Sequence, residues 1–90
     1  MLSAIRMSTF VVIRGMPSYI GGDKHERMRH VLREMYSIYG TITVVQLAFD
    51  GGSRLDHAIV NYVTTEQAAS AAGTLKRLDA DHYLTSVMGS

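Results

Sequence analysis

Four histidines are the side chains that most readily suggest chemistry, because imidazole binds metals and transfers protons near neutral pH. They are His25, His30, His57 and His82. No two of them are spaced four apart on one helix face, and the chain has no cysteine, so we predict no metal site. The paired glycines at 21–22 and 51–52 lack the lysine and serine that complete a phosphate-binding loop. The pattern therefore predicts no catalytic residue and no cofactor.

Two apolar segments, 11–16 and 55–62, lie where an RNA-binding sheet carries its signatures, the second usually K/R-G-F/Y-G/A-F-V-x-F/Y. The positions expected to face a core fit that pattern. They are Ala58, Val60 and Tyr62. The outward positions hold Val12, His57 and Ile59 where aromatic rings would stack bases, a contact worth about 1–3 kcal/mol per base. We expect the chain to keep the fold of such a domain without using this sheet face to bind RNA. A degenerate single-stranded RNA-binding module, with Arg14 on a phosphate, is the alternative.

Basic side chains also gather on the first predicted helix. Arg29 and Arg33 lie one turn apart beside its apolar arc, and Lys76 and Arg77 add charge to a later loop. Such residues form charge-assisted pairs with an acidic peptide, and Ile38, at the margin of the arc, would be pocket wall. Glutamates on the same helix reduce its positive charge. The net charge of the whole chain, +1, gives no general attraction to nucleic acid. A solvated helix face is the other interpretation.

Hydrophobic periodicity and turn residues predict the elements that position these side chains. We expect strands at 9–14, 42–49, 58–63 and 83–88, and helices at about 24–39 and 66–75. Asp23 is the expected cap of the first helix, and Thr64 with Gln67 has capping-box spacing for the second. Met28, Val31, Leu32, Met35, Tyr36 and Tyr39 form the apolar arc of the first helix.

The order β-α-β-β-α-β predicts an α+β, ferredoxin-like fold with a four-stranded antiparallel sheet and both helices on one face. Period-two alternation then sorts the strand residues. Val11 and Ile13 face the helices; Phe10, Val12, Arg14, Leu55, His57, Ile59 and Asn61 face outward. The domain is expected at 9–88. Residues 1–8 are predicted to be a disordered extension, and residues 89–90 an artificial end.

A more specific resemblance covers the span from Val11 to Val87. Three stretches are similar to the non-canonical RNA-recognition motif of subunit b of eukaryotic translation initiation factor 3. They are Val11-Val12-Ile13 to Met16-Pro17, Tyr36-Ser37-Ile38-Tyr39-Gly40-Thr41-Ile42, and Leu78-Asp79 followed by His82. The chain departs from that family at Asp56 and His57, where glycine and an aromatic residue are usual. It also has one extra residue near Ile20-Gly21.

The resemblance implies a cytoplasmic protein-docking domain that helps assemble the initiation complex on the small ribosomal subunit, the 40S subunit. Its partners would be other factor subunits: subunit a, and an acidic, tryptophan-containing peptide of subunit j. The implied site is the first helix with the loop from Lys76 to Asp81, which contains Arg29, Arg33, Ile38, Lys76 and Arg77. A small acyl-phosphate hydrolase, suggested weakly by Arg14 and Asn61, is a third alternative. No apolar run is long enough for a membrane helix.

Overall fold

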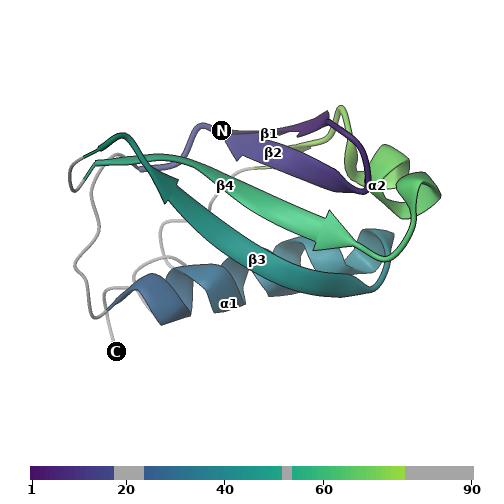
Figure 1. The fold of residues 1–90 in the computed structure, drawn as a ribbon, viewed down its shortest axis with the longest axis horizontal. Helices are drawn as coiled ribbons and strands as arrows, with labels where there is room; N and C mark the ends of the chain where they lie inside the picture. Colours follow the sequence, from purple (N-terminus) through teal and green to yellow (C-terminus); the bar gives the residue numbers. More distant parts are fainter. Residues whose placement is uncertain (18–23, 52–53, 77–90) are drawn as a thin grey trace.

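The computed structural model describes residues 1–17, 24–51 and 54–76, which form an antiparallel five-stranded sheet and two helices (Figure 1). The strands are β1 (Leu2–Arg6), β2 (Phe10–Arg14), β3 (Ile42–Phe49), β4 (Leu55–Tyr62) and β5 (Leu75–Lys76). The helices are α1 (His25–Tyr36) and α2 (Thr65–Ala71), and a 3-10 turn, η2 (Ser37–Tyr39), follows α1. The sheet order is β3-β4-β2-β1-β5, so β4 lies between β2 and β3, which α1 connects.

One core fills the space between the sheet and the helices, and the predicted helix phase and most of the strand phase are confirmed. Four residues of the α1 arc are fully buried, and Met35 and Tyr39 pack partly buried against them. Val11 and Ile13 of β2 and Ala68 and Ala71 of α2 complete the same cluster, so both helices contribute to one side of the sheet. The capping box of α2 is present: the Gln67 amide donates to the Thr64 hydroxyl at 3.2 Å.

The first difference from the sequence prediction is at the N-terminus. Residues 1–8 are not a disordered extension, because Leu2–Arg6 forms β1 and pairs antiparallel with β2, placing Ile5 opposite Val12. Leu2 and Ala4 are buried on the helix side, which gives the strand its stability. The sheet therefore has five strands rather than four. The predicted strand 83–88 lies outside the described residues, as do Asp23 and the loop residues 77–81.

The second difference concerns Leu55, predicted to face outward but only 4% exposed. Ala48 pairs with His57 and Phe49 with Leu55, so Asp56 is an extra residue in β4. Such a β-bulge reverses the facing of the residues beyond it, which brings Leu55 into the core. The second helix is also shorter than expected. It ends at Ala71, because Ala72 already has an extended backbone conformation (φ −65°, ψ 144°). Gly73 follows with φ +79° and leads into β5, which places Lys76 in a strand rather than a loop.

The close approach of the start of β1 to Gly15 requires a glycine at that position. Gly15 has φ +90°, and a Cβ atom there would lie 2.1 Å from the Met1 carbonyl oxygen. We expect Gly15→Ala to lower the free energy of unfolding by about 1–3 kcal/mol and to weaken hydrogen-exchange protection of the β1 amides. Gly51→Ala is the matched control, because its φ is +95° with no atom within 4 Å of the added Cβ. Equal losses in the two variants would show that β1 does not pass Gly15 this closely.

Two buried tyrosines connect the helix to the sheet and make stability depend on alkaline pH. The Tyr62 hydroxyl donates to the Tyr36 carbonyl at 2.6 Å. Burial raises the pKa of Tyr36 to about 12, with the neighbouring Tyr39 adding to the effect. Burial, with smaller contributions from Tyr36 and Tyr39, also raises the pKa of Tyr62.

Above the ordinary tyrosine pKa of about 10, the unfolded chain ionises while the folded chain retains these protons, so stability should fall as pH rises. Tyr62→Phe is expected to cost about 1 kcal/mol at neutral pH, because the Tyr36 carbonyl loses its donor. It should also make the alkaline decline shallower. Urea unfolding at neutral pH and at about pH 11 measures both effects. An unchanged pH slope would mean that Tyr62 ionises as readily in the folded state as in the unfolded one.

Candidate functional site

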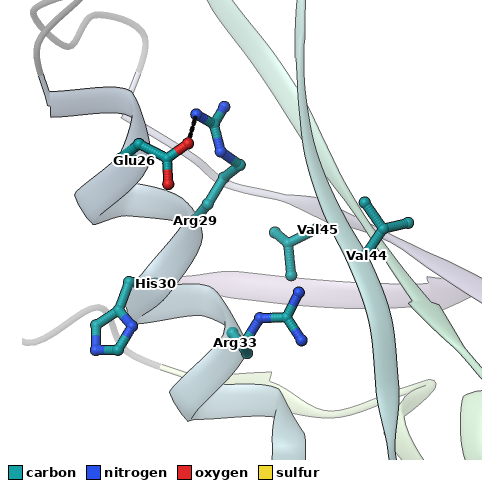
Figure 2. A pocket seen from close by; sticks show the side chains of 6 residues that line it. All are labelled: Glu26, Arg29, His30, Arg33, Val44 and Val45. Carbon is teal, nitrogen blue, oxygen red and sulfur yellow. Dashed lines mark hydrogen bonds and ion pairs between the residues drawn. The ribbon is translucent and has the colours of Figure 1, made fainter.

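A hollow of about 300 Å³ lies between α1 and β3 (Figure 2). Six residues line it. They are Glu26, Arg29, His30, Arg33, Val44 and Val45. The four polar residues follow α1 at spacings of three and four, which places them along one side of the helix beside its apolar arc. Figure 2 shows the Arg29 and Arg33 side chains extending toward β3, and Val45 extending from β3 toward the helix.

Two of the three basic side chains here already have acidic partners on the same helix. Arg29 donates to Glu26 at 2.5 Å, with the two side chains 34% and 86% exposed. His30 Nε2 lies 2.9 Å from a Glu34 carboxylate oxygen, and both side chains are well exposed. Exposed pairs of this kind contribute at most about 1 kcal/mol each, so an incoming carboxylate can compete for Arg29 and His30 at small cost.

Arg33 is the uncompensated charge of the hollow. Its guanidinium donates to the Ile42 carbonyl at 3.1 Å, across the gap from α1 to β3. Within the described parts of the chain, no carboxylate pairs with it. A guanidinium has five donors, and this contact uses one of them. Arg33 therefore retains donors that suit a carboxylate.

The strand side of the hollow is apolar. Val45 is buried in the core, whereas Val44 is 40% exposed. Both follow Thr43, where an irregularity in the β3–β4 register sets two β3 residues against one of β4. Figure 2 shows the Val44 side chain extending away from α1, so that Val44 lies at the rim of the hollow. Basic donors on α1 and an exposed valine at the rim can bind an acidic segment that carries apolar side chains. Among the residues that the structure describes, no group of His, Asp and Glu could hold a metal ion.

The sequence-predicted site is only partly brought together. Arg29 and Arg33 line the hollow beside β3, at one edge of the sheet, whereas Lys76 belongs to β5, at the other edge. Lys76 Nζ instead lies 5.2 Å from the centre of the Tyr39 ring. Ile38 is in η2 and is 71% exposed, so it is surface rather than wall of the hollow. Arg77 lies outside the described residues.

The sheet face opposite the helices holds the other predicted positions together. Val12 and Ile59 are direct neighbours across β2 and β4, and both are half-buried. Arg14 and His57 converge on Asp56, with Arg14 Nη1 at 3.8 Å and His57 Nδ1 at 2.7 Å from the same carboxylate oxygen. The His57 hydrogen bond, and the charges of His57 and Arg14, lower the pKa of Asp56. The side chains on this face that a phosphate would contact are thus already engaged by a carboxylate.

Sequence reasoning missed the strand side of the hollow and one residue of the open face. Val44 and Val45 could have been suspected, because an apolar strand directly after the first helix must pass near it. Ile5 pairs with Val12 and extends the apolar row of the open face, whereas the predicted disorder of residues 1–8 leaves Ile5 outside that face. The spacing of His30 from the other histidines gives no sign that it lines the hollow.

No family model, curated protein or solved structure matches this chain. In the described residues, neither helix has the length and apolar character needed to cross a bilayer.

Proposed function

We propose that this chain is a non-catalytic docking domain that binds an acidic peptide segment of a protein partner in the hollow between α1 and β3. The observation that carries this proposal is Arg33, a guanidinium without a carboxylate partner in the described residues, beside Arg29 and an exposed valine. Partner carboxylates would bind the arginines, and an apolar side chain, preferably tryptophan, would pack against Val44.

The fold supports a ferredoxin-like domain of the RNA-recognition-motif class as the scaffold of this proposal. β2, α1 and β3 form a βαβ unit whose two parallel strands are separated by β4, as in a split βαβ arrangement. β1 takes the place beside β2 on the other side. The sequence resemblance then suggests the setting: subunit b of translation initiation factor 3 in the cytoplasm, docking subunits a and j and acting on the 40S subunit indirectly.

A direct test uses a short blocked peptide that alternates glutamate and valine and carries one tryptophan at a valine position. The chain itself has no tryptophan, so the fluorescence on titration reports the peptide alone. We expect saturable binding, with amide shifts in labelled protein at Arg29, Arg33, Val44 and Val45. Binding without shifts at these residues, or no binding at all, would contradict the proposed site.

The second candidate is weak binding of single-stranded RNA to the open sheet face. Phe10 favours it, because this half-buried ring lies on the same side of β2 as Val12 and Arg14 and pairs with Asn61 of β4. An oligouridine titration distinguishes the two. Shifts at Phe10, Val12, His57 and Ile59 that vanish steeply with added salt would support RNA binding.

A further inference from the structure

The outer edge of β3 is unusually open for a sheet edge. β3 is the terminal strand of the sheet and has a hydrogen-bonded neighbour on one side only, among the residues described. Alternate backbone N–H and C=O groups of such a strand point away from the sheet and lack a strand partner. β3 has eight residues, ITVVQLAF, with no charged residue and no proline.

Proteins usually protect an exposed edge with lysine, proline or a very short strand. Within the described residues, the opposite edge strand, β5, carries a lysine, Lys76. The two edges of this sheet therefore differ in kind. The described part of the β5 edge carries a charge that opposes strand pairing, whereas β3 has the length and the uncharged sequence that permit it.

The hollow places donors directly beside this open edge. Arg33 already donates to an edge carbonyl, that of Ile42, and Arg29 lies one helical turn away along α1. A strand laid along the remainder of β3 would have one face toward α1 and the other toward the open side of the sheet, where Val44 is exposed. Its residues would alternate between these two environments.

We propose that the partner segment binds as an added β-strand along the outer edge of β3. Alternate acidic side chains meet Arg29 and Arg33, and the intervening apolar side chains continue the open face beside Val44. The recognised chemistry is an extended segment of alternating acidic and apolar residues, with main-chain hydrogen bonds supplying affinity and the arginines supplying selectivity. This inference rests on the proposed docking function and specifies how the partner binds.

The test compares two versions of the same glutamate–valine peptide that carry methyl groups on different sets of alternate backbone amides. One peptide carries methyl groups on two amides that would face β3, and the other carries them on the two neighbouring amides, so composition and charge are identical. Only one of the two sets of methyl groups removes N–H donors that would hydrogen-bond to β3. We therefore expect one methylated peptide to bind about tenfold or more weakly than the other. A block peptide of the same composition, with all glutamates before all valines, should also bind about tenfold more weakly, because it cannot alternate.

The outcomes separate this inference from the proposed function. If both methylated peptides bind like the parent, the hollow accepts acidic peptides without strand addition, and the inference is overturned while the docking function stands. If the parent peptide does not bind, both fail. A difference between the phases, with slower exchange of β3 amides in the complex, supports strand addition.

Discussion

Tyr36→Ala is expected to lower the free energy of unfolding by about 3–5 kcal/mol, as large aromatic truncations in cores do. Tyr36 is the largest fully buried side chain of the described residues, and it lies at the end of α1 in a single core with Ala and Val side chains of the sheet and α2. Removing the ring leaves a cavity that a domain of this size has few other interactions to offset. Urea unfolding followed by circular dichroism measures the loss of stability.

Tyr36→Phe is the matched control for this experiment. The Tyr36 hydroxyl is buried and has no hydrogen-bond partner among the described residues, so its removal ends a desolvation cost and sacrifices no bond. We therefore expect Tyr36→Phe to be as stable as the parent or slightly more so. If Tyr36→Ala unfolded at nearly the parent urea concentration, the assigned phase of α1 would be wrong.

The parts of the fold that sequence predicts well are those governed by local periodicity. The apolar arc repeats at helical spacing through α1 and into η2, and each member is buried or partly buried as predicted. The Thr64–Gln67 capping box is likewise a local signal, confirmed by a hydrogen bond. These patterns are predictable because the burial of one face depends on spacing within the element itself.

The parts that sequence missed depend on contacts between distant segments. Leu2–Arg6 has no strong strand pattern of its own, and its order comes from pairing with β2 and burial of Leu2 and Ala4. The facing of Leu55 depends on a bulge at Asp56, which alternation alone does not reveal. Lys76 and Arg33 are separated because the sheet order, unlike the sequence, places β5 and β3 at opposite edges.

In the candidate site, too, local spacing predicts one part and contacts between distant segments decide the other. Arg29 and Arg33 could be placed on one side of a helix from their spacing, and the structure confirms that placement. Which strand lies opposite them is decided by the crossover from α1 to β3 and by the order of the sheet. For that reason the sequence indicates the two valines only as part of an apolar strand after the helix, and the open edge of β3 cannot be predicted from it.

Reversing both charges of the hollow, with Arg29→Glu and Arg33→Glu together, is expected to weaken binding of the acidic tryptophan-containing peptide by about tenfold or more. The variant replaces two attractions by two repulsions at the same positions. Its effect on stability should be about 1–2 kcal/mol, because it removes the Glu26–Arg29 pair and the hydrogen bond from Arg33 to the Ile42 carbonyl and places two new glutamates one turn apart on an exposed helix face. Calorimetry or peptide fluorescence gives the affinity, and urea unfolding the stability.

The control must change net charge equally, because a more acidic domain repels an acidic peptide at long range. Arg6→Glu with Arg54→Glu serves this purpose: both arginines are exposed, and neither lines the hollow. We expect this control to reduce affinity much less than the hollow variant, and added salt to remove most of its effect. If the two double variants weakened binding equally, the peptide would be responding to overall charge and not to the hollow between α1 and β3. Because Arg33 has the only guanidinium of the hollow without a carboxylate among the described residues, Arg33→Glu alone should account for most of the effect.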